Sequence, residues 1–378
     1  MSDIYQESVE LHRKNGGKLE VRSKVPILTR NDLSLAYTPG VAEVCRVIAM
    51  DKTQACALTL KKNTVAVISD GSAILGLGNL GPEAALPVME GKCILFKEFG
   101  GVDAFPICLD TQDEEEIIKT IKYLAPVFGG INLEDISAPR CFSIEERLKA
   151  ELDIPVMHDD QHGAATAILA GLINALRARG SRKENVRVVI NGAGAAGVAV
   201  VKLLLKYGFN HIIACDREGT IYAGRAGLNS AKRELAEATN YANIKGGLGD
   251  AIKNADIFIG LSAAGTLSAE MVQTMNRRPI VFALANPTPE IMPEEAKDAG
   301  AFIIATGRSD YPNQINNVLV FPGLFRGALD NRVKQITDSM LIRAAENLAH
   351  LVETPTAEEI LPSPFNKEVA KTVAGAVY

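Results

Sequence analysis

The stretch VRVVINGAGAAG (186–197), with the runs VAVVKLLLKYG (198–208) and HIIACD (211–216) after it, decides the fold. The pattern predicts a strand that passes directly into a glycine-rich turn, then a helix and a second strand. Glycines in this arrangement let a pyrophosphate approach the backbone at the start of the helix. An acid ending the second strand, about 20 residues on, suits the ribose hydroxyls. We therefore expect a βαβ unit that binds a dinucleotide.

The predicted cofactor contacts follow from this placement. Asn286 is added because it follows the apolar strand pattern 279–284, where an edge-of-sheet amide can bind a cofactor amide or a carboxylate. The same amide is equally able to stabilise a turn. The full predicted set is Gly192, Gly194, Ala195, Ala196, Gly197, Val198, Asp216 and Asn286.

A second segment, GLGNLG (76–81), matches the same glycine motif. It begins several residues after the predicted strand 64–69, whereas a phosphate-binding turn must follow its strand directly. The next predicted strand ends at Asp110, too far along to supply the ribose contact. We interpret this segment as a loop that binds no dinucleotide.

The choice between NAD and NADP stays open at this point. Asp216 favours NAD, because a carboxylate pairs with the ribose hydroxyls and repels a 2′-phosphate. Four cations follow closely, and they either neutralise a phosphate or form a solvated helix face. They are Arg217, Arg225, Lys232 and Arg233.

Strand-length apolar runs alternate with helical patterns along the chain, which predicts an α/β fold with largely parallel strands. A long helical pattern, 163–179, separates two groups of strands. We expect an N-terminal α/β domain (1–160), a Rossmann-like doubly wound dinucleotide-binding domain (161–330), and C-terminal helices (331–378) that pack back on the body.

Composition excludes several classes of protein. The 378 residues carry a net charge of −5, which gives no reason to expect nucleic acid as a partner. The apolar runs are short and broken by charges, so we expect no membrane segment, and the polar N-terminus does not resemble a signal peptide. Six cysteines without a CxxC pair indicate reduced thiols and a cytoplasmic protein.

Two acidic pairs follow predicted strands: Glu134-Asp135 after 129–133, and Asp159-Asp160 after 154–157. Carboxylates at this edge of a parallel sheet favour Mg²⁺ or Mn²⁺. Both members of a pair bind only where the chain turns, because neighbouring strand residues face opposite ways. The alternative is that these acids cap helices. The nearby His158 and His162 raise zinc as a rival, which the several carboxylates and the lack of a nearby cysteine disfavour.

Two further residues are candidates for acid–base chemistry. Lys92 lies in the apolar helical pattern PVMEGKCILF, where it is either a snorkelling surface lysine or a base whose pKa a neighbouring metal lowers. Tyr37 precedes a Thr-Pro-Gly turn that would fix its position as a candidate acid. The alternative is that it is a partly buried loop tyrosine without a catalytic role. Asn316 and Asn317 precede the segment VLVFPG, and Asn317 is a second candidate amide.

At this point the chain resembles the malic enzyme family over almost its whole length. The motifs that carry the resemblance are LAYTPGVA (35–42), SDGSAILGLGNLGPEAALPVMEGK (69–92), FKEFGGVDAFPI (96–107), NLEDI (132–136), HDDQHGAATA (158–167), INGAGAAG (190–197), FALANPTPE (282–290) and NNVLVFPG (316–323).

The resemblance implies a role for each candidate. Tyr37 is the general acid, Lys92 the general base and Asp159 an orienting carboxylate. Lys92, Asn286 and Asn317 contact the substrate. The metal ligands are Glu134, Asp135 and Asp160.

The implied activity is oxidation and decarboxylation of L-malate to pyruvate, with NAD or NADP and with Mg²⁺ or Mn²⁺, in a homodimer. Larger family members have a substrate-gripping arginine where this chain has Ala73, so the sequence leaves open what replaces it. Three alternatives stay open. They are a malate-to-lactate converter or an oxaloacetate decarboxylase with retained cofactor, and a regulatory protein that binds dinucleotide without turnover.

Overall fold

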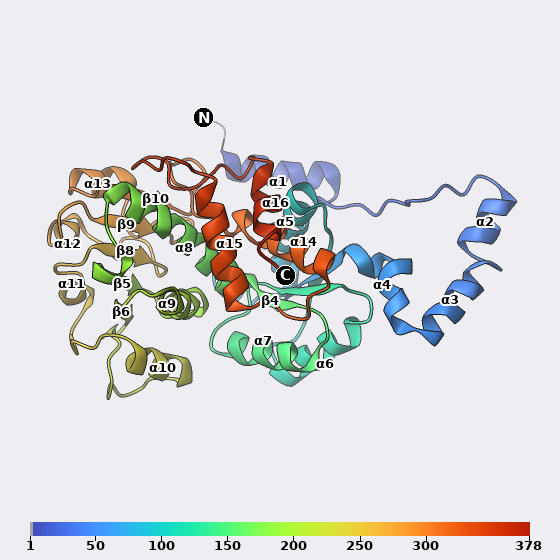
Figure 1. The fold of residues 1–378 in the computed structure, drawn as a ribbon, viewed down its shortest axis with the longest axis horizontal. Coiled ribbons are helices and arrows are strands. Elements are labelled where there is room, and N and C mark those ends of the chain that lie inside the picture. The colour runs from blue at the N-terminus through green and yellow to red at the C-terminus, as the bar shows by residue number, and fades with distance from the viewer. Residues whose placement is uncertain (1–2) are drawn as a thin grey trace.

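The computed structural model describes residues 3–378 and contains two β-sheets, each with helices on both faces (Figure 1). The first sheet is entirely parallel and has the order β2-β1-β3-β4. Its strands are β1 (Thr64–Ser69), β2 (Asp103–Cys108), β3 (Gly130–Leu133) and β4 (Val156–His158).

The second sheet has the order β10-β9-β8-β5-β6-β7 and is parallel except for β7. The chain leaves β5 toward β6 on one side and returns to β8 on the other, which makes the crevice at the ends of β5 and β8 the ligand position of such folds. The predicted α/β class with a doubly wound second sheet is confirmed. The strands are β5 (Arg187–Asn191), β6 (His211–Asp216), β7 (Gly219–Thr220), β8 (Ile257–Gly260), β9 (Ile280–Ala283) and β10 (Ile303–Thr306).

Helices bury alternate sides of the first sheet. On one face, α6 (Glu114–Leu124) and α7 (Arg140–Glu151) pack on side chains such as Ile68. On the other face, Val65 meets α5 (Pro82–Gly100). This alternation is the period-two pattern of a strand that is buried on both sides.

The long helix α8 (Asp159–Arg179) links the two sheets. Fourteen of its residues are buried, and it packs against α9 (Ala195–Tyr207), the helix after the glycine-rich turn. The helix begins four residues earlier than the pattern 163–179 predicts, so Asp159 and Asp160 occupy its first turn, where a helix dipole favours negative charge.

Smaller helices complete both layers. In the second sheet's region they are α10 (Ser230–Ala238), α11 (Leu248–Ala251), α12 (Ala269–Gln273) and α13 (Pro293–Asp298), with 3-10 turns η3 (Lys183–Asn185) and η4 (Asn317–Leu319). The C-terminal helices are α14 (Phe321–Asn331), α15 (Asp338–His350) and α16 (Glu368–Ala374).

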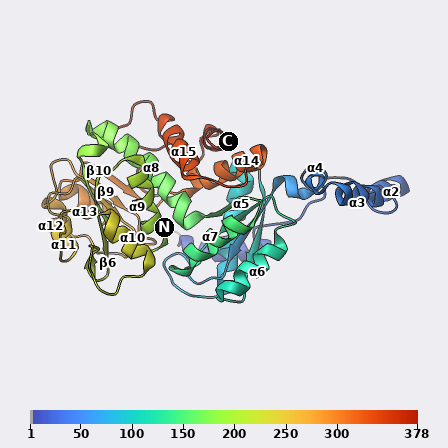
Figure 2. The same cartoon turned by 60° about the horizontal axis from the view of Figure 1, so that its bottom comes forward.

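The C-terminal helices return to the first sheet's side of the molecule (Figure 2). The Phe96 ring of α5 lies 4.6 Å from Phe321 and 5.4 Å from Phe325 of α14, centroid to centroid. A Cβ on Gly100 would lie 2.8 Å from the Pro322 carbonyl oxygen, so glycine permits this close approach of the two helices. Since α15 packs on α8, these helices bridge both sheets.

An extended segment, residues 20–60, projects from the body in both views (Figures 1 and 2) and is called the arm below. It holds α2 (Arg30–Ala36), α3 (Val41–Met50), η1 (Lys52–Gln54) and α4 (Ala55–Leu58), and it is followed by η2 (Leu60–Asn63). Helix α1 (Ile4–Asn15) precedes it and lies near α5, where His12 is 4.0 Å from Glu90. Of the described residues before Thr64, none is buried.

The arm is apolar as well as exposed. Arg30–Met50 has the length and mean hydropathy, 1.2, of a membrane-spanning helix, and no part of that window is buried. The structure divides it into helices of 7 and 10 residues on either side of a turn at Tyr37–Gly40. Each is shorter than the roughly 20 residues that a spanning helix needs.

Candidate active site

Strand register brings the two acidic pairs together. Leu133 at the end of β3 pairs with His158 at the end of β4, so the residues that follow each strand are neighbours. Asp135 has φ +53°, a left-handed conformation that costs a non-glycine residue roughly 1–2 kcal/mol. The chain therefore turns after β3, which is the condition for Glu134 and Asp135 to face one site.

Glu134, Asp135 and Asp160 form a three-carboxylate group whose oxygens lie within 4.8 Å of one another, the one such group found among residues 3–378. The Asp135 amide donates to Asp160 Oδ2 at 2.8 Å, and this hydrogen bond holds together the segment after β3 and the start of α8. Asp135 Oδ2 is buried without a hydrogen-bond partner. Three hard oxygen donors with one orphaned acceptor fit Mg²⁺ or Mn²⁺.

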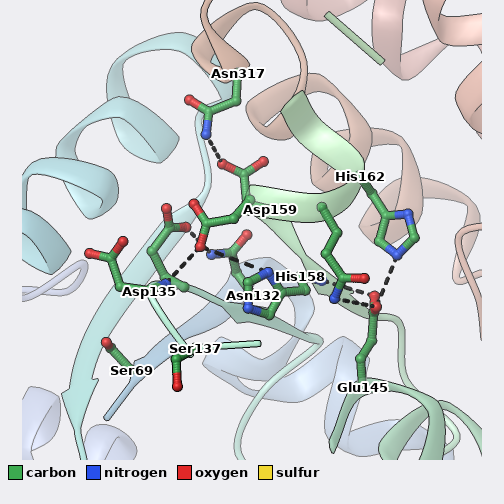
Figure 3. Close-up of polar contacts among 12 residues, drawn as sticks. Ser69, Asn132, Asp135, Ser137, Glu145, His158, Asp159, His162 and Asn317 are labelled. Atoms are coloured by element: carbon green, nitrogen blue, oxygen red, sulfur yellow. Dashed lines mark hydrogen bonds and ion pairs between the residues drawn. The ribbon is translucent and has the colours of Figure 1, made fainter. Parts of the chain in front are cut away.

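The two histidines lie outside this group. His162 contacts Glu145 Oε2 at 2.9 Å, on the far side of the α8 N-terminus (Figure 3). His158 is completely buried, and burial lowers its pKa to about 4, so the ring is neutral. The His158 amide donates to Glu145 Oε1 at 3.0 Å, which anchors the end of β4. His158 Nδ1 lies 3.8 Å from Asp160 Oδ2, and neither ring nitrogen has a hydrogen-bond partner. The three-carboxylate group contains neither histidine, and its oxygen donors suit a hard cation better than zinc.

Lys92 is buried beside the carboxylates. Its Nζ donates to Asp159 Oδ2 at 2.7 Å, lies 2.9 Å from Glu134 Oε1, and is 4.4 Å from the centre of the Phe321 ring. Burial alone would lower the pKa of Lys92, but Asp159 and Glu134 outweigh it and raise that pKa above its usual value. The lysine is therefore not a snorkelling surface residue.

Asp159 links two parts of the chain, and Figure 3 shows its hydrogen bond with Asn317. Its Oδ2 accepts hydrogen bonds from both Lys92 and the Asn317 side chain, and the carboxylate is fully buried. A Cβ on Gly163 would lie only 1.8 Å from Asp159 Oδ1, so glycine one turn along α8 makes room for the carboxylate. Asn317, at the start of η4, thereby links the C-terminal half of the chain to this cluster.

Sequence reasoning did not identify two supporting residues, Gly163 and Asn132. Asn132 Nδ2 donates to Glu134 Oε2 at 2.9 Å from within β3 and holds that side chain in place. A polar residue in an otherwise apolar strand was the available signal for Asn132. No local pattern marks Gly163, because its importance depends on the rotamer of Asp159.

The carboxylates repel one another in a buried setting. Burial first, and neighbouring charges second, raise the pKa of Glu134 to about 7 and that of Asp135 to about 9. The same causes raise the pKa of Asp159 to about 7 and that of Asp160 to about 6. The single positive charge of Lys92 does not compensate four acids, so the cluster favours a further cation.

The glycine-rich turn after β5 has the shape that a pyrophosphate requires. Gly192 has φ +121°, and a Cβ there would lie 2.3 Å from the Leu261 carbonyl oxygen. A Cβ on Gly197 would lie 1.7 Å from the Gly192 carbonyl oxygen. Gly194 differs, because a Cβ there meets no protein atom within 4 Å. The open space over Gly194, at the start of α9, fits a phosphate group.

The remaining predicted contacts of this turn lie where the pattern expects them. Ala195 and Ala196 begin α9, and Val198 is buried beneath it. Asp216 ends β6, next to the turn. Its carboxylate already pairs with Arg225 and Lys232, whereas Arg217 and Arg233 are exposed.

The second glycine segment, 76–81, has a different position. Ile74 and Gly78 form an isolated bridge that closes a tight turn ahead of α5. A Cβ on Gly76 would lie 2.8 Å from the Asn286 carbonyl oxygen, so this loop reaches the turn after β9. It leads into α5, whose N-cap is Gly81, but it does not follow its strand directly, because β1 ends at Ser69. Asn286, one of the predicted cofactor contacts, lies on that turn after β9. Its side chain is next to Gly307, where a Cβ would lie 2.8 Å from Asn286 Nδ2.

Tyr37 does not lie with the other predicted catalytic residues. It sits on the arm at the end of α2, is 65% exposed, and is separated from α5 in both views (Figures 1 and 2). The structure thus brings together Lys92, Glu134, Asp135, Asp159, Asp160 and Asn317, and leaves Tyr37 apart.

Gly194→Val is expected to weaken NADH binding strongly with little loss of thermal stability, because the new side chain fills only the space of the pyrophosphate. Nicotinamide fluorescence titration and a thermal melt measure the two effects. Gly78→Val is the matched control in the other glycine loop and should leave NADH affinity largely intact. The reverse outcome would mean that the 76–81 loop holds the dinucleotide.

The affinity for Mn²⁺ is expected to rise with pH from about 6 to about 9, because the ion must displace protons from carboxyl groups whose pKa values are raised. Calorimetry in buffers of different ionisation enthalpy should detect proton release. Asp135→Asn should abolish this binding, while Asp153→Asn, an exposed control, should not. Affinity that is independent of pH, or binding that survives Asp135→Asn, would contradict the assignment.

Comparisons with known proteins match this geometry. Residues 16–149 match the malic enzyme N-terminal domain family, and residues 161–378 match the malic enzyme NAD-binding domain family. The chain is 56% identical to the bifunctional malic/malolactic enzyme of Bacillus subtilis, over 99% of this chain and 92% of that one. It is 58% identical to the NAD-dependent malic enzyme of Geobacillus stearothermophilus, over 96% of this chain and 76% of the relative.

Solved structures agree. The NAD-dependent malic enzyme of Thermotoga maritima superposes with a TM-score of 0.95 at 50% identity, and 98% of each chain is covered. The malic enzyme of Pyrococcus horikoshii gives a TM-score of 0.94 at 50% identity, over 99% of this chain and 90% of that one. With both halves of the chain matched, in sequence and in structure, the chain belongs to the malic enzyme family.

Proposed function

We propose that the chain oxidises and decarboxylates L-malate to pyruvate and CO₂, reducing NAD or NADP with the help of Mg²⁺ or Mn²⁺. The observation that carries the proposal is the buried Lys92, which contacts Asp159 and Glu134 beside a three-carboxylate group. A desolvated amine next to a hard-cation site is suited to deprotonating a hydroxyl group. The glycine-rich turn after β5 would bind the nicotinamide dinucleotide, which accepts the hydride.

Glu134, Asp135 and Asp160 would hold the metal. When bound, a divalent ion there polarises the C2 oxygen and stabilises the charge that develops as CO₂ leaves. Asn132 orients Glu134 through the hydrogen bond between their side chains, and the Asp135 amide holds Asp160. The chain's own contribution is thus a set of carboxylates that is fixed before any ligand arrives.

Lys92 would act as the base for the C2 hydroxyl proton. Its carboxylate neighbours raise its pKa, which opposes this role. A divalent ion on the same carboxylates counters that effect, because a nearby positive charge disfavours the ammonium form. Asp159 would orient the amine, and Asn317 would hold Asp159.

Asn286 and Asn317 are the proposed substrate or nicotinamide contacts. Both lie on turns at the carboxyl edge of the second sheet's region, after β9 and at η4. The position of the family's substrate-binding arginine is Ala73, whose amide donates to the Asp135 carbonyl oxygen at 3.0 Å. The segment around Ala73 thus supports the turn that holds Glu134 and Asp135. Lys92 and the metal would together supply the positive charge that binds the substrate carboxylate.

A second activity, conversion of malate to lactate, is favoured by one specific finding. The Bacillus subtilis relative, 56% identical, is named a bifunctional malic/malolactic enzyme. Retention of the reduced cofactor after decarboxylation would permit that outcome in the same site. It needs no catalytic group beyond those already described.

The proposed division of the chain is 1–160, 161–330 and 331–378, with the acid cluster on the first part and the dinucleotide turn on the second. We also propose a cytoplasmic location. The six cysteines are free thiols, which suits a reducing compartment.

We further propose a homodimer in which the arm of one protomer completes the site of the other. Three observations support it: the arm is apolar and unburied, Tyr37 at its turn is 65% exposed, and the described contacts of Lys92 include no tyrosine. Exposed leucines 75, 77, 80 and 86 flank the start of α5 and offer the body an apolar surface. Exchange of identical arms is a low-cost route to a symmetric dimer.

Initial rates with malate test the activity. We expect NADH or NADPH to form together with pyruvate, only in the presence of Mg²⁺ or Mn²⁺, and to stop with excess chelator. Lactate formation without net NAD(P)H would instead establish the malolactic activity as the principal one. Neither product, with dinucleotide binding intact, would contradict catalysis and leave a regulatory binding protein.

Coexpression of two inactive variants tests the exchanged arm. Lys92→Ala and Tyr37→Phe should each lose roughly 10²–10⁴-fold in rate. A mixed dimer combines the intact Tyr37 of one chain with the intact Lys92 of the other, so random mixing should restore about a quarter of the wild-type rate. If both residues act within one protomer, no mixed dimer contains a complete site, and the mixture stays as slow as the variants.

A further inference from the structure

Asp216, the acid that ends β6, has no free hydrogen-bonding capacity. Its oxygens lie 2.8 and 2.7 Å from Arg225 Nη2, Lys232 Nζ donates to Oδ2 at 2.7 Å, and the Glu218 amide donates to Oδ1 at 3.0 Å. A carboxylate has about four acceptor sites. All four are therefore used before a ligand arrives, and the side chain is only 8% exposed.

The two cations on Asp216 differ in freedom. Arg225 is 10% exposed, and its Nη1 also donates to the carbonyl oxygens of Gly219 at 3.2 Å and Thr220 at 2.9 Å. The guanidinium is thus fixed as part of the loop after β6. Lys232, in the first turn of α10, is 25% exposed and makes one described hydrogen bond, to Asp216. An ammonium has three donors, so Lys232 keeps two for a ligand.

The position of this group determines what it contacts. In a doubly wound sheet the adenosine ribose lies at the carboxyl end of the strand that follows the phosphate-binding helix, which here is β6. A free aspartate at that place selects NAD by repelling a 2′-phosphate. Here Arg225 pairs with Asp216 and also with the exposed Glu218, whose Oε2 lies 3.3 Å from Arg225 Nη2. Lys232 contacts Asp216, and the exposed Arg217 is adjacent to that residue. The three cations therefore outnumber the two carboxylates.

We infer that Asp216 in this chain does not select against NADP but positions Lys232, which contacts the 2′-phosphate, so that the protein binds NADPH at least as tightly as NADH. The inference rests on the proposed function only in requiring a nicotinamide dinucleotide on the second sheet. It assigns specificity to a pre-formed Arg225–Asp216–Lys232 contact, with Arg225 holding the carboxylate and Lys232 meeting the ligand.

Equilibrium titration of nicotinamide fluorescence with NADPH and NADH tests the inference without turnover. Lys232→Gln should weaken NADPH binding about 10- to 100-fold, the range of one charge-assisted hydrogen bond. The same change should alter NADH affinity by no more than about threefold. Lys232→Arg should retain NADPH binding, and Arg233→Gln, on the exposed neighbouring position, is the matched control and should change neither affinity.

Ionic strength gives a second readout. In the wild type, added salt should weaken NADPH binding more steeply than NADH binding, because salt screens the contact with the extra phosphate. That difference should shrink in Lys232→Gln. A thermal melt of each variant confirms that the fold is retained.

The inference is overturned if the wild type binds NADH more tightly than NADPH, or if Lys232→Gln leaves both affinities unchanged or weakens both equally. These results would leave malate oxidation with NAD intact as the proposed function. Absence of binding to either dinucleotide is a separate outcome, which would overturn the dinucleotide site itself.

Discussion

The contact of Lys92 with Asp159 and Glu134 is the constraint on which the rest of the site depends. A buried ammonium and buried carboxylates are tolerated only together, because each alone would carry a large desolvation penalty. The helix α5 supplies the cation, and β3 and the start of α8 supply the anions. Replacing any one of them leaves the others as uncompensated charge, so the chemistry and the local stability of this region cannot be separated.

The surrounding structure serves to keep these charges close. The register of β3 against β4 aligns the two acidic pairs, the turn at Asp135 aims them at one point, and Gly163 leaves space for Asp159. The C-terminal half contributes through Asn317, which donates to the same Asp159 oxygen that binds Lys92. One carboxylate thus connects the first sheet, the long helix α8 and the segment before α14.

Much of this arrangement could be predicted from sequence because it is local. Strand, glycine turn, helix and acid occur in order between 186 and 216, and strand ends followed by paired acids mark the cluster. The register that brings both pairs together, and the start of α8 at Asp159, required the structure. So did the partners of Asp216, because the path of the loop from 217 to 232 sets them and no short pattern encodes that path. The sequence motif around Tyr37 indicated a catalytic residue but contained nothing about its distance from Lys92.

The absence of buried residues before Thr64, within the described chain, has a consequence for how this protein is regulated by its own abundance. All three hydrophobic core clusters, and the dinucleotide turn, are made of residues after Thr64 within one protomer. Under the proposed arm exchange, a single protomer lacks a complete active site, because Tyr37 would come from its partner. Dilution would then dissociate the dimer and stop the reaction without unfolding the cores. The specific activity per protomer would therefore depend on the concentration of the protein.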